Sequence, residues 1–299
     1  MFTELINLLS EDKVKLKEPF KKHTTFHIGG PADCMVFPET IDDLKTALSF
    51  CLQNGLSPFV FGLGSNLLVS DKGLRGLSIK IGERFKGVSV SENNLTALAG
   101  TSLAQCAKEA ARNALGGLEF AEGIPGGIAG AVVMNAGAYD GEMKDVAEEV
   151  SVINLSGQVN LLKKEELEFN YRRSRFSQSQ EIIIQVKLQL YKDDKQKIFQ
   201  KMKDLAEIRR AKQPLDYPSA GSAFKRPKGL YVGPLLEEMG LKGHKIGGAQ
   251  VSEKHAGFII NTGNAAAADV FNLITDIQTK VFEKHGIILE PEIIIVGDF

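Results

Sequence analysis

The residues of this chain that could take part in chemistry gather in a few short segments, and two of these are rich in glycine. The first, Gly62-Leu63-Gly64-Ser65-Asn66, directly follows an apolar run at 58–61 that predicts a β-strand. Backbone N–H groups at such a strand end can bind an anion, because glycine adopts positive φ angles without strain. The alternative is an ordinary tight turn, which is what an isolated pair of glycines usually indicates. A Rossmann fingerprint is excluded, since Leu67 stands where the third glycine belongs and no helix is predicted to follow.

The second glycine-rich segment, residues 123–139, contains five glycines, Pro125 and no charged residue. It is shorter than the roughly 20 apolar residues that a membrane helix needs. Small residues let the backbone approach a flat ligand, and N–H groups can bind a pyrophosphate without a basic side chain. Tight packing alone explains the segment less well, because each glycine weakens regular structure. Together the two segments predict a bound dinucleotide.

Three polar features accompany the glycine-rich segments. Residues 171–176, YRRSRF, place three arginines within five residues, which could also be a solvated surface turn. Residues 218–227, PSAGSAFKRP, hold two serines before two cations and could bind phosphate or position a hydroxyl group. They lack the G-x-S-x-G pattern of serine esterases. Glu292 interrupts the apolar run 287–296, and a carboxylate that is costly to bury is a candidate functional group.

Composition excludes several classes of function. Lys+Arg 36 against Asp+Glu 37 gives a net charge of -1, so we expect no nucleic-acid partner and no membrane partner. Cys34, Cys51 and Cys106 are odd in number and show no C-x-x-C spacing, which indicates free thiols in a reducing compartment. His23 and His27 lack an acidic or cysteine partner nearby, so no metal site is expected. The first residues lack the features of an export signal, and we expect a cytoplasmic protein.

The elements that must position these residues alternate between helices and short strands. Helices are predicted at 40–54, 102–115, 194–212, 233–239 and 265–284, the third with Ile198, Met202, Leu205 and Ile208 on its buried side. Strands are predicted at 34–37, 58–61, 67–69, 77–81, 88–90, 95–98, 150–155, 159–162 and 182–191. The run 287–296 is interpreted as a buried strand that returns to an earlier sheet. A domain boundary is placed near Lys212.

Taken together, these segments resemble the UDP-N-acetylenolpyruvoylglucosamine reductases (MurB), flavoenzymes of bacterial cell-wall precursor synthesis. The matching pieces keep the family's order, span almost the whole chain and look like the shorter of the family's two classes. They are TTFHIGGPAD (24–33), GLGSNLLV (62–69), GIPGGIAGAVVMNAGAYDGE (123–142), YRRSRF (171–176), PSAGSAFKRP (218–227), GLKGHKIGGAQVSEKHAGFIIN (240–261) and LEPEI (289–293). One departure is His27, where the family more often has arginine or lysine.

The resemblance implies an α+β fold: a two-lobed FAD-binding domain of the PCMH type, similar to that of vanillyl-alcohol oxidase, and an α/β substrate-binding domain. The N-terminal FAD-binding lobe would comprise residues 1–90. The central lobe would comprise residues 91–212 and be rejoined by 287–299, and the substrate-binding domain would comprise residues 213–286.

The resemblance also implies an activity. NADPH would reduce noncovalently bound FAD, which would reduce UDP-N-acetylglucosamine enolpyruvate to UDP-N-acetylmuramate for peptidoglycan synthesis, and so for cell-wall biogenesis, cell shape and cell division. Arg172 would stabilise the anion formed by hydride addition, Glu292 would assist polarisation, and Ser222 would donate the proton. The FAD-binding residues would be Gly62, Leu63, Gly64, Ser65, Asn66, Gly123, Ile124, Pro125, Gly126, Gly127, Gly130, Asn135, Ala136 and Gly137. The substrate-binding residues would be Tyr171, Lys225, Tyr231 and Asn261.

Two other functions stay open at this point. A flavin oxidase of the same FAD-binding fold would often tether its flavin through histidine or cysteine. A nucleotide-sugar sensor would keep the pocket without the chemistry, although a binding module has no use for a proton donor. In each case the partners are small molecules, and the sequence leaves the oligomeric state open.

Overall fold

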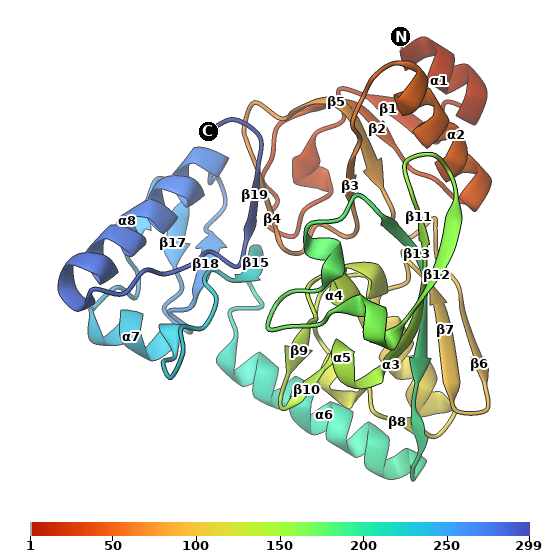
Figure 1. Ribbon diagram of the computed structural model, residues 1–299. Helices are drawn as coiled ribbons and strands as arrows, with labels where there is room; N and C mark the ends of the chain where they lie inside the picture. The colour runs from red at the N-terminus through yellow and green to blue at the C-terminus, as the bar shows by residue number, and fades with distance from the viewer. Residues whose placement is uncertain (1) are drawn as a thin grey trace. The chain divides into compact units, whose positions relative to one another are not determined.

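The computed structural model describes residues 2–299, and the chain divides into two compact units that interleave along the sequence (Figure 1). Unit 1 comprises the residues up to Leu16, Cys34–Leu63 and Gly76–Arg209; unit 2 comprises Lys17–Asp33, Gly64–Arg75 and Arg210–Phe299. The glycine-rich loop at 62–66 therefore lies where the chain passes from one unit to the other. The division predicted from the sequence, with lobes 1–90 and 91–212, residues 287–299 rejoining the central lobe, and a substrate-binding domain at 213–286, stays a prediction.

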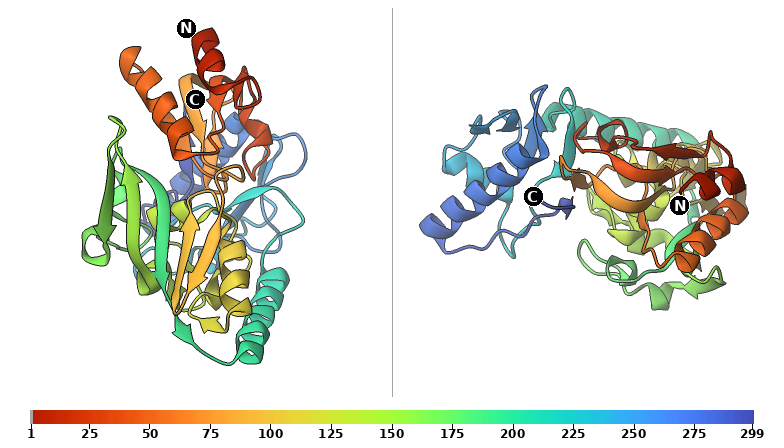
Figure 2. Two further views of the ribbon diagram at one scale, coloured as in Figure 1. Left: turned by 90° about the vertical axis from the view of Figure 1, so that its right-hand side faces the viewer. Right: turned by 90° about the horizontal axis from the view of Figure 1, so that it is seen from above.

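A five-stranded antiparallel sheet forms the centre of unit 1, in the order β12-β11-β13-β7-β6. The long strand β13 (Ile182–Gln189) alternates toward its end between buried and exposed side chains, as a half-buried strand does. β11 (Ala147–Ile153) and β12 (Val159–Lys163) form the predicted hairpin, and Gly157 takes a φ of 82° in its turn. Helix α3 (Leu103–Arg112) packs on β6 and β7 (Figure 2, left).

A four-stranded sheet, β1-β2-β5-β3, carries the N-terminal part of the chain, and α2 (Ile41–Gln53) belongs to the same core. A capping box starts α2: Asp43 N donates to Thr40 Oγ1, and Thr40 N donates to Asp43 Oδ2, both at 3.1 Å. Lys13 Nζ lies 3.0 Å from both oxygens of Asp43. Burial would raise the pKa of Asp43, but hydrogen bonds from Glu39 N, Lys13 and Thr40 N together hold that pKa below its usual value.

Unit 2 has its own core and a four-stranded antiparallel sheet in the order β15-β18-β17-β16. Helix α8 (Ala267–His285) packs on β16 and β17 and buries Val270, Leu273 and Ile277. Two backbone N–H groups in its first turn, those of Ala267 and Ala268, donate to the carboxylate of Asp71 at 2.9 and 3.0 Å. An acidic group at this end also complements the helix dipole.

Apart from the 18-residue helix α6, the remaining elements of the two units are short. In unit 1 and at its borders they are α1 (Phe2–Leu9), β1 (Val14–Leu16), β2 (Ala32–Val36), β3 (Phe59–Phe61), β5 (Leu74–Lys80), β6 (Val88–Ser91), β7 (Asn94–Leu98), β8 (Leu115–Gly116), η2 (Glu119–Ala121), α4 (Ile128–Val133), β9 (Gly137–Ala138), β10 (Gly141–Glu142), α5 (Met143–Val146), η3 (Lys164–Leu167), η4 (Arg175–Ser177), β14 (Tyr191–Lys192) and α6 (Lys195–Lys212). In unit 2 they are η1 (Phe20–Lys22), β4 (Leu67–Val69), β15 (Ser219–Ser222), α7 (Val232–Glu238), β16 (Lys245–Ile246), β17 (Ala249–Val251), β18 (Phe258–Asn261) and β19 (Ile294–Val296).

Two sequence predictions about these elements are wrong. The run 287–296 is not one buried strand: only Ile294–Val296 forms a strand, paired in parallel with β4, and Ile288 is 80% exposed. Pro291 has no N–H to donate and forms an isolated bridge with Phe224 instead. The buried side of α6 is also misplaced, since Ile208 is 39% exposed and Arg209 is buried. The other predicted helices and strands are confirmed, with ends shifted by a few residues.

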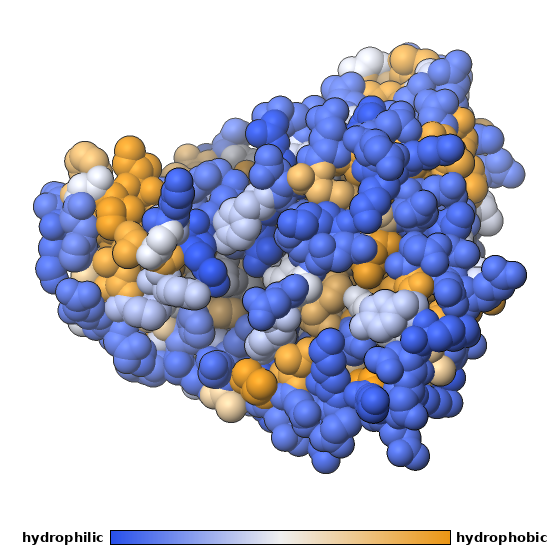
Figure 3. Space-filling view, turned by 60° about the horizontal axis from the view of Figure 1, so that its bottom comes forward, coloured by the Kyte–Doolittle hydropathy of each residue, from blue (hydrophilic) through white to orange (hydrophobic). Residues whose placement is uncertain are grey.

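The face of the molecule drawn in Figure 3 is largely hydrophilic, with hydrophobic side chains in separate small groups. Within residues 2–299, no helix is long and apolar enough to span a membrane.

Candidate active site

The loop at 62–66 follows β3 and presents several backbone donors. Within residues 2–299, the N–H groups of residues 63–66 donate no hydrogen bond. Gly64 has a φ of 66°, and a Cβ built on it would lie 2.2 Å from His23 O. Thr25 N donates to Gly64 O at 3.2 Å, which fixes the loop against the neighbouring segment. The loop thus offers consecutive N–H groups to an anion.

The second glycine-rich loop approaches Leu63, the residue of the first loop that ends this stretch of unit 1. A Cβ built on Gly127 would lie 3.9 Å from Leu63 Cγ and 3.2 Å from Ala99 O, so only glycine fits here without a shift. Two backbone bonds hold the loop to the segment before α3: Leu103 N donates to Gly126 O at 2.9 Å, and the N–H of residue 128 donates to the carbonyl of residue 101. The N–H groups of Gly126 and Gly127 themselves donate to no acceptor in the part of the chain that the structure describes.

Arg172 sits in a tight turn that the structure brings against this second loop. Asn170 N donates to Arg173 O at 2.8 Å, Arg173 N donates to Asn170 O at 3.2 Å, and Arg172 has a φ of 51°. Arg172 Nη2 donates to Gly137 O at 3.2 Å, and its guanidinium carbon lies 5.2 Å from the Tyr171 ring centroid. The predicted anion-stabilising residue and the predicted cofactor loop therefore meet, while Tyr171 stays half exposed.

Ser222 and Glu292 lie on adjacent backbone segments of unit 2, although 70 positions separate them in the sequence. Glu292 N donates to Ala223 O at 2.9 Å, and Lys225 N donates to Glu290 O at 2.8 Å. Ser222 ends β15, pairs with β18 and follows Gly221 at a φ of 79°. Both side chains are partly buried. A hydroxyl donor and a carboxylate are thus carried by one paired region.

The last residue of the first loop belongs to the same region. Asn66 Nδ2 donates to Glu292 O at 3.0 Å, and Ile294 N donates to Asn66 O at 2.9 Å. Since the loop carries free N–H groups and is fixed to the segment of Glu292, binding at the loop and placement of this carboxylate are structurally linked.

The predicted substrate-binding residues of unit 2 differ in exposure. Lys225 is partly buried and forms an ion pair with Glu290, whereas Tyr231 is 61% exposed. Asn261 is only 4% exposed: its Nδ2 donates to Phe26 O at 3.0 Å, and its Oδ1 accepts from Gly263 N at 2.9 Å and Ala265 N at 3.1 Å. The structure gives Asn261 a supporting role within unit 2, and binding of substrate by Asn261 stays a prediction.

Arg209 is a residue that sequence reasoning missed. It is 6% exposed, its guanidinium carbon lies 5.5 Å from the Tyr139 ring centroid, and a Cβ on Gly123 would lie 2.9 Å from its Cδ. Burial lowers the pKa of Arg209, and the charge of Glu122 and the Tyr139 hydroxyl act in the opposite direction. The signal was present, since position 209 continues the helical spacing of the buried positions 198 and 202, but an arginine is an unexpected residue on a buried face.

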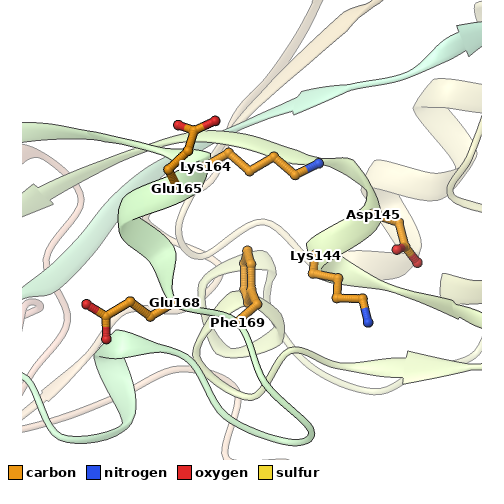
Figure 4. Close-up of a pocket in the computed structure, with 6 residues that line it drawn as sticks. All are labelled: Lys144, Asp145, Lys164, Glu165, Glu168 and Phe169. Atoms are coloured by element: carbon orange, nitrogen blue, oxygen red, sulfur yellow. The ribbon is translucent and has the colours of Figure 1, made fainter.

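A cavity of about 490 Å³ opens elsewhere on unit 1 and contains none of the predicted site residues. In Figure 4, Phe169 stands at its centre, and the carboxylates of Glu165 and Glu168 point away from it. Two lysines and three acids line it, so the charges nearly cancel: Lys144, Asp145, Lys164, Glu165, Glu168 and Phe169. This charge balance gives the cavity no preference for a phosphate-bearing ligand.

Comparison with known proteins decides the family. A reductase from Syntrophomonas wolfei, named UDP-N-acetylenolpyruvoylglucosamine reductase, is 50% identical over 298 residues and covers 100% of both chains. This chain belongs to the UDP-N-acetylenolpyruvoylglucosamine reductase family. A reductase of the same name from Caldanaerobacter subterraneus is 48% identical over 99% of this chain and 97% of its own. The resemblance inferred from the sequence is confirmed.

Family models and solved structures give the same result and confirm the α+β fold. The model described as an FAD binding domain matches residues 32–162, and the one for the C-terminal domain of this reductase matches residues 213–296. The MurB crystal structure from Thermus caldophilus is 37% identical, has a TM-score of 0.82 and covers 95% of this chain and 98% of its own. A 4-ethylphenol oxidase from Gulosibacter chungangensis, 14% identical with a TM-score of 0.50 over 63% of this chain and 42% of its own, shares the fold alone.

FAD fits the residues present in this MurB family member. The N–H groups of residues 63–66, and separately those of Gly126 and Gly127, are donors of the kind that a pyrophosphate accepts from, without a basic side chain. A Cβ built on Gly130 would meet no described atom within 4 Å, so the backbone there is open to a flat partner. By contrast, the N–H groups of Asn135 and Ala136 are already bonded to Val132 O and Ala131 O.

Proposed function

We propose that this chain catalyses the NADPH-dependent reduction of UDP-N-acetylglucosamine enolpyruvate to UDP-N-acetylmuramate, a step of peptidoglycan precursor synthesis, in the cytoplasm. The observation that carries the proposal is the pairing of the Ser222 and Glu292 segments through Glu292 N and Ala223 O at 2.9 Å. A hydroxyl group and a carboxylate on paired segments suit an enolpyruvyl reduction, whereas a binding module needs no proton donor. The names and full-length coverage of the relatives support the same reaction.

Bound FAD would supply a hydride, taken from NADPH, to the enolpyruvyl carbon that is distal to the substrate carboxylate. The C=C electron pair then moves toward the carboxylate, and an enolate-like anion forms on the substrate. Arg172 stabilises this anion through its guanidinium, which is held in place by Gly137 O. A placed donor of this kind contributes about 10²–10³-fold to the rate.

Ser222 completes the addition by giving its hydroxyl proton to the carbanion-like carbon, and it recovers a proton from water. A serine hydroxyl is a weak acid, but such a carbon is a strong enough base to accept from it. Glu292 assists by polarising the substrate. Positioned proton transfer contributes about 10²–10⁴-fold to the rate.

The segment after β15 in unit 2 would hold the uridine diphosphate portion of the substrate. Lys225 and Arg226 supply two positive charges, and the Arg226 guanidinium carbon lies 4.1 Å from the Tyr231 ring centroid. Tyr231 is 61% exposed and available for contact with a sugar or base, and Tyr171, in unit 1, is half exposed. Asn261 would act by supporting the β18 end of this region.

Visible spectroscopy of the purified holoenzyme tests the reaction. Under anaerobic conditions the flavin band should bleach with NADPH and return on addition of the enolpyruvyl sugar. In Ser222→Ala the bleaching should stay near normal while the return slows by about 10²-fold or more. Ser219→Ala, in the same strand, is the control and should behave as the unmodified protein. Equal losses in both half-reactions would remove Ser222 from the donor role.

The two alternatives give different outcomes in the same experiment. A flavin oxidase would recover its band only with air. A thiol tether is disfavoured because Cys34, Cys51 and Cys106 are buried, and burial raises the pKa of Cys51 to about 11 and of Cys106 to about 12. Acid precipitation would leave a tethered flavin in the pellet and a noncovalent one in the supernatant. A nucleotide-sugar sensor would bind the sugar without restoring the band.

A further inference from the structure

Asn135 occupies the point where three segments of unit 1 meet. It is fully buried, with 0% exposure, and has a φ of 42° directly after α4. Its Nδ2 donates to Glu142 Oε2 at 2.8 Å and to Asn170 O at 3.0 Å, and its Oδ1 accepts from Lys144 N at 2.9 Å. Both amide protons therefore have acceptors, which is what a buried side-chain amide requires.

These bonds lead directly to the turn that carries Arg172. Asn170 O, which accepts from Asn135, belongs to the first residue of that turn, and Arg173 N closes the turn onto the same carbonyl. The far side of the turn is held by Ser174 Oγ, which donates to Val133 O at 2.8 Å at the end of α4. The turn is thus fixed at both ends to residues of the second glycine-rich segment.

The family resemblance implied that Asn135 binds FAD, but the residue has no free N–H group to offer a cofactor. The backbone N–H is bonded to Val132 O at 3.2 Å, and both amide protons are engaged with Glu142 and Asn170. We propose instead that Asn135 is a positioning residue, which fixes the Arg172 turn against the loop that ends at Gly137. The proposal rests on the anion-stabilising role given to Arg172 above.

The residue type fits this role. Asparagine tolerates a left-handed backbone better than most residues, and its planar amide donates in two directions while accepting in a third. Aspartate would lose both donors and place a second carboxylate against Glu142. Glycine would keep the backbone conformation and remove only the side chain, so Asn135→Gly isolates the hydrogen bonds.

The test uses the holoenzyme of Asn135→Gly and three readouts. Tryptic cleavage after Arg172 and Arg173, followed by mass spectrometry, should accelerate about tenfold relative to the other sites of cleavage. Hydride transfer to the enolpyruvyl sugar should slow by about 10–100-fold, the loss expected when a catalytic group moves by about 1 Å. FAD affinity and reduction by NADPH should stay within about threefold of the unmodified enzyme, because Asn135 gives no bond to the cofactor.

Asn154→Gly is the matched control. Its side chain organises the β11–β12 turn of the same unit, with Oδ1 accepting from Ser156 N and Gln158 N, and it lies outside the Arg172 turn. It should change none of the three readouts. Should Asn135→Gly fail to fold, Asn135→Ala also removes the side-chain amide without adding a charge beside Glu142, and the same results are expected.

Each outcome decides the proposal. A loss of FAD affinity with unchanged cleavage would make Asn135 a cofactor residue and overturn it. Unchanged cleavage together with an unchanged second half-reaction would overturn it as well. If the unmodified enzyme does not reduce the enolpyruvyl sugar, the proposed function fails, whereas faster cleavage in the turn would still support anchoring by Asn135.

Discussion

Gly64 is the position where the anion-binding role of the loop at 62–66 can be tested most directly. Its φ is 66°, and an added Cβ would lie 2.2 Å from His23 O and 3.0 Å from Thr24 Cα. The contacting atoms are backbone, so they cannot rotate away as a flexible side chain would. Gly64→Ala should therefore displace the loop itself and reorient the N–H groups of residues 63–66.

Gly55 provides a control that separates the two costs of this substitution. Its φ is 63°, nearly the same, but an added Cβ would meet no described atom within 4 Å. Gly55→Ala then costs only the left-handed conformation, about 1–2 kcal/mol. Gly64→Ala adds the strain of a forced backbone shift, about 1–3 kcal/mol by analogy with overpacking, for a total of about 2–5 kcal/mol.

Two assays measure the effect. Urea unfolding of the FAD-free proteins should show Gly64→Ala less stable than Gly55→Ala by about 1–3 kcal/mol. Titration with FAD, followed by flavin fluorescence, should show that Gly64→Ala raises the dissociation constant for FAD by about tenfold or more, a loss of ~1.4 kcal/mol or more. Gly55→Ala should leave this constant unchanged. Equal stability of the two variants would mean that the backbone relieves the contact between the added Cβ and His23 O at no measurable cost. Unchanged FAD affinity in Gly64→Ala would refute the assignment of this loop to the pyrophosphate.

Three further changes have defined outcomes. Arg209→Met removes a buried guanidinium from beneath the second loop and should weaken FAD binding about tenfold by fluorescence titration, whereas Arg210→Met, at the exposed neighbouring position, should not. Glu292→Gln should keep its yellow flavin and lose turnover by about 10²-fold in the spectroscopic assay. Asp43→Asn should lower the free energy of unfolding by about 1–2 kcal/mol at pH 7. The folded-state pKa of Asp43 is depressed, so its contribution is present above the unfolded pKa of 3.8 and is lost as pH falls through the folded value. The difference from Asp43→Asn should therefore shrink in urea unfolding at pH 3.

Contrary results would be equally informative for these three. Equal FAD affinity of the two arginine variants would make Arg209 a packing residue with no influence on the loop. A colourless Glu292→Gln would show that this carboxylate supports flavin binding or the fold. A cost for Asp43→Asn that stays constant down to pH 3 would show that shape, and not charge, accounts for the capping box.

The sequence predicted the parts of the site that depend on local backbone chemistry. Gly64 and Gly123 could be found because positive φ angles and close backbone approach restrict those positions to glycine. The capping residues Thr40 and Ser102 could be found because a hydroxyl side chain just before an apolar helical pattern commonly accepts a hydrogen bond from the first turn of the helix. These signals lie within a few residues of the structures they specify.

The features that the sequence misplaced depend on partners distant in the chain. The side chain of Arg209 is buried because it packs against Tyr139 and Gly123. The sequence of the helix that carries Arg209 does not indicate either contact. The run before β19 looks like a buried strand by composition, yet Pro291 pairs with Phe224 and leaves Ile288 exposed. No local pattern distinguishes these cases from an ordinary helix face or an ordinary strand.

The contrast between local signals and distant partners also applies to the proposed catalytic groups. Ser222 and Glu292 come from segments with no local relation, and a few backbone hydrogen bonds, with the Asn66 amide, set their positions. Asn66 also ends the loop whose N–H groups face no protein acceptor within residues 2–299, so the loop and the segment of Glu292 are joined by hydrogen bonds. In the proposed function, FAD held at this loop would therefore also fix the backbone that carries the Glu292 carboxylate. Local glycine chemistry, readable in the sequence, is thus coupled to the position of a carboxylate whose neighbours are not.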